Sequence, residues 1–552
     1  MKFRSLLLTG LFFSFIASAN EFYQFTYQGK DPIFETPLKA NEYRNPILAG
    51  FYPDPSIIRV DGDYYLVNSS FSYSPGVPIF HSKDLVNWKS LGHILVSPKQ
   101  LPLEQQSTSR GIYAPTIRYH KGVFYLITTL VDVRGNFIVT AKDPAGPWSD
   151  PILLPEIGGI DPDLFFDEDG KVYIAHNEAP VGEPLYNGHR AIWLWEFDLK
   201  TQKVVKDSGR VIVNGGADIA KKPIWIEGPH IYKINGWYYL SCAEGGTADQ
   251  HSQVIFRSKS LNEPFIPYEG NPILTQRNLD ANRKNPIANT GHADFVQTKE
   301  GEWWAVFLGV RPYEKNLFNT GRETFLLPVK WKDGWPIILE KGHAIPHQLT
   351  APKIQQHTAS TDMMTGNFVW TDSFEKSMIG HEWLKLRMSA TEFASIKNGS
   401  LFLQAKDARM DSLEQPAFLG RRQQHAYFDA STEMSIPEDN SSAGLVAFQN
   451  ENHHYYFGVK TLNRQSTLFI EQAKGAAPQA IYQAPLEEGL TKITLEIKVN
   501  AGKISFFYQN KQGQTQTALK EADAKILSTE VAGGFIGTTI GVHARQETPS
   551  TD

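Results

Sequence analysis

The chain has 552 residues, a formal net charge of −5 and 41% hydrophobic residues. This composition is typical of a soluble globular protein with one to four domains. The small acidic charge excludes a strongly basic surface for nucleic acid. The single cysteine, Cys242, excludes an internal disulfide.

The first residues have the pattern of a cleavable export signal. Lys2 and Arg4 precede an apolar run at residues 5–16, which is too short to span a bilayer comfortably. An Ala-Ser-Ala cleavage site follows, so we expect a signal peptide at residues 1–19 and export to the periplasm or beyond. No later stretch has the pattern of a membrane anchor, and residues 20–40 have that of a polar leader.

One phrase, a glycine followed by aromatic and β-branched residues, recurs five times. The copies begin at Gly62, Gly122, Gly170, Gly236 and Gly301. Their spacings are 60, 48, 66 and 65 residues. A shorter strand-like run precedes each copy, and a turn at the glycine joins the two into a hairpin. Five hairpin units at this period predict a five-bladed β-propeller over residues 41–345.

The strand-like runs begin with five residues in equivalent positions. These are Asp54, Ala114, Asp161, Glu227 and His292. The innermost strand of each propeller blade lines the channel, so these side chains are expected to face one another. An Asp before Pro is also a common turn starter. Acids at three of five equivalent positions are not explained by turns alone, because clustered carboxylates repel one another.

The remaining chain predicts a second domain. A polar segment from about 341 to 366, interrupted by Pro346 and Pro352, is expected to be an ordered linker. Short alternating strands then indicate a β-sandwich of the jelly-roll type at residues 367–552. The expected fold class is therefore all-β, a five-bladed β-propeller followed by a jelly-roll β-sandwich.

Several phrases resemble glycoside hydrolase family 43. They are FYPDPSIIRVDGDYYLVNSSFSYSPGVPIFHSKDLVNW, IDPDLFFDEDGKVYI, IEGPHIYKINGWYYL and GRETF. The resemblance is to the β-xylosidase and α-L-arabinofuranosidase branch with an added C-terminal sandwich. It implies hydrolysis with inversion, with Asp54 as general base, Glu227 as general acid and Asp161 as the carboxyl that orients Glu227 and tunes its pKa. An inverting glycosidase needs its base and acid about 6.5–9.5 Å apart, which suits two blades that are not neighbours.

The same resemblance implies five substrate-binding residues, which are Phe71, Tyr113, His292, Arg322 and Phe535. Arg322 matches a sugar-binding arginine, although a surface pair with Glu323 is the alternative. Phe71 matches a hydrophobic wall, and Tyr113 stands where relatives often carry tryptophan, which leaves the sugar preference open. Phe535 in GGFIGTT matches an aromatic that a sandwich loop supplies, closing one end of the groove and favouring exo action.

His292 matches a histidine on the channel axis that holds a calcium ion or an ordered water. A core histidine bonded to a backbone carbonyl is the alternative. The chain has no EF-hand loop or other metal-ligand spacing. We therefore expect no required cofactor, with calcium on the propeller axis as the one candidate ion.

The expected function is exo-acting β-1,4-xylosidase on xylo-oligosaccharides. An α-L-arabinofuranosidase, alone or as a second activity, is the alternative, because the two sugars present similar hydroxyls; an endo-arabinanase fits the extra domain less well. A non-catalytic carbohydrate-binding propeller would not need all three acids. The expected partner is a xylo- or arabino-oligosaccharide, and the sequence leaves the oligomeric state open.

Overall fold

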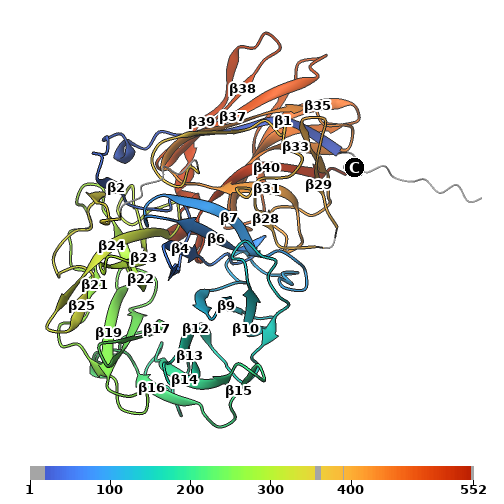
Figure 1. Ribbon diagram of the computed structural model, residues 1–552. Coiled ribbons are helices and arrows are strands. Elements are labelled where there is room, and N and C mark those ends of the chain that lie inside the picture. The colour runs from blue at the N-terminus through green and yellow to red at the C-terminus, as the bar shows by residue number, and fades with distance from the viewer. Residues whose placement is uncertain (1–18, 355–361, 390, 549–552) are drawn as a thin grey trace, which may run out of the picture.

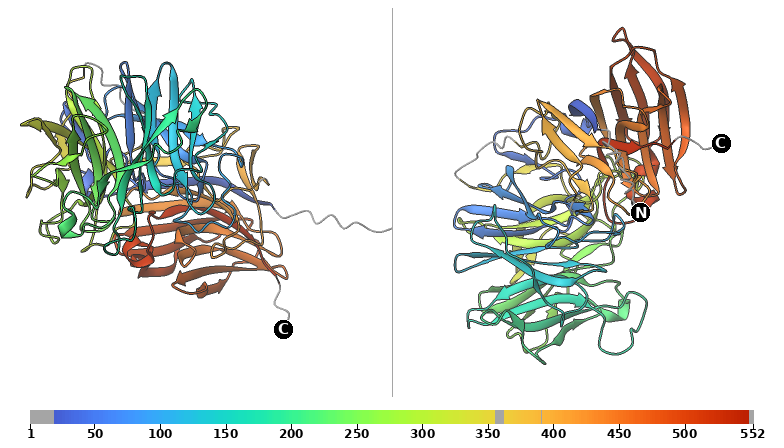
Figure 2. Two further views of the ribbon diagram at one scale, coloured as in Figure 1. Left: turned by 90° about the horizontal axis from the view of Figure 1, so that it is seen from below. Right: turned by 90° about the vertical axis from the view of Figure 1, so that its right-hand side faces the viewer.

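The computed structural model describes residues 19–354, 362–389 and 391–548 (Figure 1). The chain forms a β-propeller and a β-sandwich that pack side by side, as Figure 2 shows in two further views. The predicted fold class is therefore confirmed. The predicted signal peptide lies outside the described residues, except for Ala19.

Five antiparallel sheets form the propeller, each with at least four strands that follow one another outward from the axis. The innermost strands are β3 (Ser56–Val60), β8 (Thr116–His120), β12 (Ile160–Phe166), β17 (Glu227–Ile234) and β22 (Ala288–Gln297). Each of these strands contacts the innermost strand of the next blade, and β22 contacts β3, so they form a closed ring. The recurring phrase thus predicted the order of the blades correctly.

The outer strands complete each blade. The second strands are β4 (Asp63–Val67), β9 (Val123–Leu130), β13 (Val172–Glu178), β18 (Trp237–Glu244) and β23 (Trp303–Val310). The third strands are β6 (Gly76–Ser82), β10 (Gly135–Ala141), β14 (Ala191–Asp198), β19 (Ser252–Ser258) and β24 (Glu323–Lys332). The outermost strands are β7 (Trp88–Leu95), β11 (Ile152–Leu153), β15 (Lys203–Val204), β16 (Arg210–Asn214), β20 (Ile266–Pro267), β21 (Leu274–Thr275) and β25 (Trp335–Ile337).

The propeller core lies between neighbouring blades. Each of the five pairs of adjacent sheets encloses its own cluster of buried apolar side chains. Cys242 belongs to the cluster between the third and fourth blades, where it is a small buried hydrophobic residue. The strands β2 (Glu42–Arg44) and β26 (Gln348–Thr350) pair where the chain enters and leaves the propeller.

The sandwich consists of an eight-stranded and a six-stranded sheet. The larger sheet contains β29 (Ala394–Lys397), β30 (Ser400–Gln404), β1 (Ala19–Gly29), β27 (Val369–Asp372), β32 (Tyr427–Ser435), β37 (Lys492–Asn500), β38 (Lys503–Gln509) and β39 (Thr515–Asp523). The smaller contains β31 (Ala417–Arg422), β40 (Thr539–Gln546), β33 (Ser441–Asn450), β34 (His453–Leu462), β35 (Gln465–Lys474) and β36 (Gln479–Pro485). The short elements η1 (Pro32–Phe34), η2 (Ile219–Lys221), η3 (Ala524–Leu527), α1 (Thr529–Ala532) and the pair β5 (Tyr73–Ser74) and β28 (Lys385–Leu386) lie in the connections.

The expectation of a polar leader at residues 20–40 is wrong. Strand β1 lies inside the larger sandwich sheet and pairs with β32 along most of its length. Its side chains Phe22, Phe25 and Tyr27 are fully buried in the sandwich core. A β-bulge between Phe22 and Gln24 shifts the alternation by one residue, so the apolar positions do not follow a period of two.

The two domains share an apolar interface. Phe71 and Tyr73 of the propeller pack in one buried cluster with Phe418, Phe448 and Ile536 of the sandwich. This cluster places a sandwich loop beside the end of the propeller channel where the acidic residues lie.

Candidate active site

Three of the five predicted axial residues share one backbone feature, and it recurs next to a fourth. Asp54, Asp161 and His292 have left-handed φ angles of 53°, 56° and 54°, and Gly228, next to Glu227, has a φ of 55°. Such angles are rare outside glycine and persist where the surrounding fold holds them. The pairing register also shifts across Asp161, Gly228 and His292. A β-bulge re-aims the side chains beside it, so equivalent turns direct equivalent side chains into the channel.

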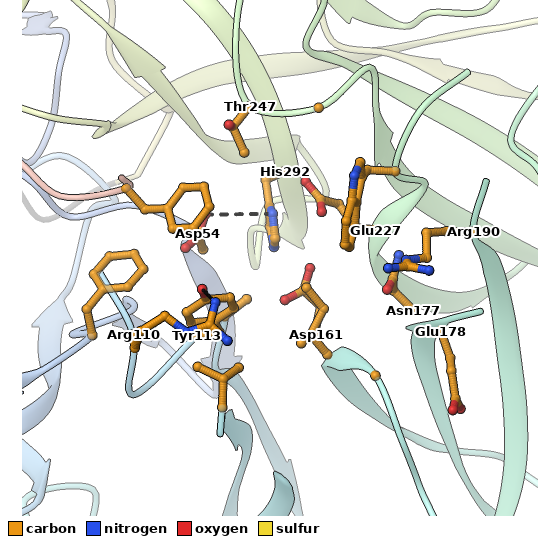
Figure 3. Close-up of a pocket in the computed structure, with 18 of the residues that line it drawn as sticks. Asp54, Arg110, Tyr113, Asp161, Asn177, Glu178, Arg190, Glu227, Thr247 and His292 are labelled. Carbon is orange, nitrogen blue, oxygen red and sulfur yellow. Dashed lines mark hydrogen bonds and ion pairs between the residues drawn. The ribbon is translucent and has the colours of Figure 1, made fainter. Parts of the chain in front are cut away.

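These side chains line one cavity of about 710 Å³ (Figure 3). It contains every residue that the sequence predicted for the site: Asp54, Phe71, Tyr113, Asp161, Glu227, His292, Arg322 and Phe535. The three carboxyl groups are each less than 10% exposed. The structure therefore brings together acids that lie up to 173 residues apart in the chain.

Asp54 is held as a carboxylate. Ser69 Oγ donates a hydrogen bond to Asp54 Oδ2 at 2.6 Å, and Arg322 Nη1 donates to Oδ1 at 2.9 Å. Burial opposes ionisation of Asp54, but the charge of Arg322 and these hydrogen bonds outweigh it and keep the pKa below its ordinary value. The alternative pairing of Arg322 with Glu323 does not occur, because Glu323 accepts two hydrogen bonds from Arg311.

Glu227 has the opposite environment. Its carboxyl has no hydrogen-bond or ion-pair partner within residues 19–354, 362–389 and 391–548. Burial, and then the charges of Asp161 and Asp54, raise the pKa of Glu227 well above its ordinary value. Glu227 therefore carries a proton under conditions in which Asp54 carries a charge.

The pKa of Asp161 is intermediate between those of Asp54 and Glu227. Burial, and then the neighbouring charge of Asp54, raise the pKa of Asp161 to about 7. The backbone N–H of Gly228 donates to Asp161 Oδ2 at 3.2 Å. Asp161 thus contacts the residue next to Glu227 and is placed to influence it.

His292 is neutral and lies beside Asp54. Burial lowers the pKa of His292 to about 4, and His292 Nδ1 lies 3.8 Å from Asp54 Oδ1. In the described part of the chain, His292 does not hydrogen-bond a backbone carbonyl, which was the alternative interpretation of this residue.

The residues around the axis do not fit a calcium ion held by protein ligands. Calcium takes six to eight oxygen ligands, and the described residues contain no group of three His, Cys, Asp or Glu side chains that could hold a metal. The next layer down the axis already contains a cation, Arg118. Its guanidinium lies 2.8 Å from Asp163 and 3.1 Å from Asp294, and it also contacts His230 Nδ1 at 3.1 Å. An axial ion stays a prediction, and no chemical step is assigned to one.

Three aromatic rings form one end of the cavity. Phe535, from the sandwich loop after α1, lies 6.3 Å from Phe71 and 5.9 Å from Tyr113 between ring centroids. Its backbone N–H donates to Ser109 Oγ at 3.0 Å, and its carbonyl accepts from Arg322 at 3.4 Å. The sandwich thus contributes both a ring and a hydrogen-bond acceptor to the propeller cavity.

Several lining residues were not predicted from the sequence. They are Arg110, Asn177, Glu178, Arg190, Trp225 and Thr247. Trp225 stands two residues before Glu227, so its proximity to the acid motif was a usable signal. Arg190 precedes β14 in the third blade, whose outer sequence departs from the repeat, and no local pattern distinguished it.

The comparisons with known proteins agree with this geometry. Residues 43–336 match the family described as glycosyl hydrolases family 43, and residues 371–552 match a β-xylosidase C-terminal concanavalin A-like domain. A xylosidase/arabinosidase of Butyrivibrio fibrisolvens is 40% identical over 92% of this chain and 96% of its own. A non-reducing end α-L-arabinofuranosidase of Bacteroides ovatus is 36% identical over 92% of each.

A solved structure shows the same arrangement of both domains. The crystal structure of a GH43_12 protein retrieved from a capybara gut metagenome covers 96% of this chain and all of its own, with a TM-score of 0.90 and 42% identity. Fold, cavity and sequence together define a glycoside hydrolase. The chain belongs to glycosyl hydrolases family 43. No helix among its described residues is long and apolar enough to cross a membrane.

Proposed function

We propose that the chain is an exo-acting, inverting β-xylosidase that removes xylose from the non-reducing end of xylo-oligosaccharides. One observation carries this proposal. In a single cavity, Asp54 is hydrogen-bonded to Arg322 and Ser69 and its pKa is lowered, whereas Glu227 lacks such partners among the described residues and its pKa is raised. Two carboxyl groups with such opposite protonation states are what base and acid catalysis of glycoside hydrolysis needs.

Asp54 acts as the general base. Its carboxylate takes a proton from a water molecule while the water oxygen forms a bond to the anomeric carbon of xylose. Glu227 gives its proton to the glycosidic oxygen as the bond from that oxygen to the anomeric carbon breaks. The water attacks the face opposite to the leaving group, so the configuration inverts. Asp161 keeps Glu227 protonated through its charge, and Arg322 holds Asp54 in position.

The aromatic end of the cavity supports exo action. Phe71, Tyr113 and Phe535 pack against one another at one end, where a longer chain would have to continue in endo hydrolysis. A terminal sugar can pack against such rings through its apolar C–H faces. The partner expected from this shape is a short oligosaccharide bound by its non-reducing end.

An α-L-arabinofuranosidase is the second candidate. The Bacteroides ovatus relative carries that name, and the Butyrivibrio fibrisolvens relative is named for both sugars. The same catalytic residues would serve either sugar, so both activities could reside in this one cavity.

The test measures hydrolysis of 4-nitrophenyl β-D-xylopyranoside and 4-nitrophenyl α-L-arabinofuranoside side by side. We expect turnover of the xyloside, with the α-anomer of xylose appearing first by proton NMR. A strong preference for the arabinofuranoside would select the second candidate. Release of β-xylose, or no turnover of either glycoside, would contradict the inverting mechanism or the enzyme function.

We also infer that the chain is exported. This inference is supported by the signal-like pattern at residues 1–19. Cleavage after Ala19 would leave all but the first residue of β1 in place. N-terminal sequencing of the protein from the periplasm or medium tests it, with Asn20 as the expected first residue.

A further inference from the structure

The two ends of the cavity differ in chemistry. The end near Asp54 is closed by Phe71, Tyr113 and Phe535. At the other end, beyond Glu227, Figure 3 shows Arg190. The Arg190 guanidinium lies 4.2 Å from the centroid of the Trp225 ring, so the two side chains form one stack.

The charge of Arg190 acts on the neighbouring Glu178 carboxyl, but its hydrogen bonds differ from those of the other cavity arginines. Arg322 donates to Asp54, and Arg110 forms two hydrogen bonds to Asp132. Within the described ranges, the Arg190 guanidinium forms neither a hydrogen bond nor an ion pair, and the same holds for the indole N–H of Trp225. The stack therefore presents several unused hydrogen-bond donors at the edge of a catalytic cavity.

The position of the stack relative to the acid is fixed by the backbone. Trp225 stands two residues before Glu227 and has a left-handed φ of 52°. Its N–H donates to the carbonyl of Gly188 at 2.9 Å, which ties it to the turn that leads into Arg190. A non-glycine residue in this conformation is held by its surroundings, so the indole has a defined place beside Glu227.

We propose that Trp225 and Arg190 bind the leaving-group sugar, and that this sugar is a neutral pyranose such as xylose. The inference rests on the proposed function, because the general acid must contact the oxygen that leaves. If Glu227 is that acid, the leaving sugar lies on the Glu227 side of the cleaved bond. There the stack offers a flat surface to the sugar ring, and Arg190 donates hydrogen bonds to its hydroxyls.

The neighbouring side chains select a neutral sugar. Asn177 and Glu178 line the same part of the cavity and offer oxygen acceptors to hydroxyl groups. A donor at Arg190 and acceptors at these two residues match a polyol. A leaving group with a carboxylate would be attracted by Arg190 but repelled by the Glu178 carboxyl. It would therefore gain less binding free energy than a neutral sugar.

The experiment compares two leaving groups in the full-length enzyme. kcat/KM is measured for xylobiose and for 4-nitrophenyl β-xyloside in the wild type, Arg190→Ala and Arg190→Lys. We expect Arg190→Ala to lower kcat/KM for xylobiose by about tenfold to a hundredfold but for the nitrophenyl glycoside by less than about threefold, because a charged donor to hydroxyls is lost. Arg190→Lys should recover little, since a lysine lacks the planar fork.

A chemically matched stack elsewhere provides the control. Arg257 lies over Trp237 and Trp335 at 4.5 and 4.1 Å, and none of these residues lines the cavity. Arg257→Ala should leave kcat/KM unchanged for both substrates. Equal loss on both substrates in Arg190→Ala, or no loss on either, would overturn the inference. So would a higher wild-type kcat/KM for a xyloside with a uronic acid leaving group, measured alongside, than for xylobiose. A wild type that cleaves neither substrate would instead overturn the proposed function.

Discussion

At the scale of single residues, the site depends on where protons reside among three buried carboxyl groups. Arg322 and Ser69 favour the charged form of Asp54, whereas Glu227 has no such partners among the residues described. Burial, and then the charges of Asp161 and Asp54, keep the proton on Glu227, because burial disfavours its charged form and like charges repel one another. Activity should therefore fall at low pH as Asp54 is protonated and at high pH as Glu227 loses its proton.

Asp161→Asn tests this coupling. Removing the negative charge of Asp161 makes ionisation of Glu227 easier, so the pKa of Glu227 falls. The alkaline limb of the profile of kcat/KM against pH should then move to lower pH. Asp167→Asn removes a buried carboxyl of the same blade that does not line the cavity, and it should leave the limb in place. An alkaline limb that stays fixed or rises in Asp161→Asn would refute the coupling.

Glu227→Gln tests the stability cost of the same arrangement. A carboxyl whose pKa is raised in the folded state destabilises that state once the pH exceeds its pKa in the unfolded chain, which is about 4.3. The cost is about 1.4 kcal/mol for each unit by which the two pKa values differ. The variant should therefore be more resistant to urea than the wild type at pH 7–8. Its advantage should shrink towards pH 4, where the wild-type carboxyl is protonated in both states. A variant that is less stable than the wild type at pH 8 would contradict the raised pKa.

At the scale of elements, the loop after α1 couples the sandwich to catalysis. Gly534 has a φ of 84°, and a Cβ there would lie 2.1 Å from Ser109 Oγ, the acceptor for the Phe535 N–H. Gly533 has a similar φ of 75°, but a Cβ there meets nothing within 4 Å. Alanine at either position would therefore strain the backbone, but only at Gly534 would its Cβ also contact the propeller.

Gly534→Ala should displace Phe535 from the cavity, and Gly533→Ala should not. We expect kcat/KM of the first variant to fall by about tenfold more than that of the second, since a small misplacement near the chemistry is costly. Both should unfold at similar temperatures. Equal activity in the two variants would mean that the position of Phe535 does not matter for turnover.

The sequence was informative where elements repeat and less so where they do not. The inner strands could be predicted because Asp54, Asp161 and Glu227 occur in the same register of one recurring phrase. Strand β1 was missed because its bulge breaks the alternation on which strand prediction depends. Arg190 was missed because no local pattern marks a residue that stacks on a segment 35 residues away, whereas Trp225, two residues before Glu227, had a usable signal in its proximity to the acid motif.

At the scale of the whole molecule, a buried guanidinium ties the blades together beneath the active site. Arg118 of the second blade pairs with Asp163 of the third and Asp294 of the fifth. Ser56 of the first blade and Tyr232 of the fourth donate to Asp294. Contacts from all five blades therefore meet in one network that closes the ring.

Arg118→Met should destabilise the protein by about 3–5 kcal/mol, because it leaves two buried carboxylates without their cation. Arg59→Met, at an exposed position of β3, should have little effect on urea unfolding.

We also expect wild-type activity to survive exhaustive chelation, because Arg118 already supplies a positive charge on the axis. Loss of activity on chelation that calcium restores would show instead that an axial ion is required.

The central claim, that Asp54 and Glu227 divide the roles of base and acid, is tested most directly by how their variants respond to the leaving group. Initial rates of Asp54→Asn and Glu227→Gln are measured on xylobiose and on aryl xylosides whose phenols decrease in pKa. Glu227→Gln should be inactive on xylobiose and recover as the phenol becomes a better leaving group, whereas Asp54→Asn should stay inactive on every substrate. Near-normal hydrolysis of xylobiose by either variant, or recovery of Asp54→Asn alone, would contradict the account.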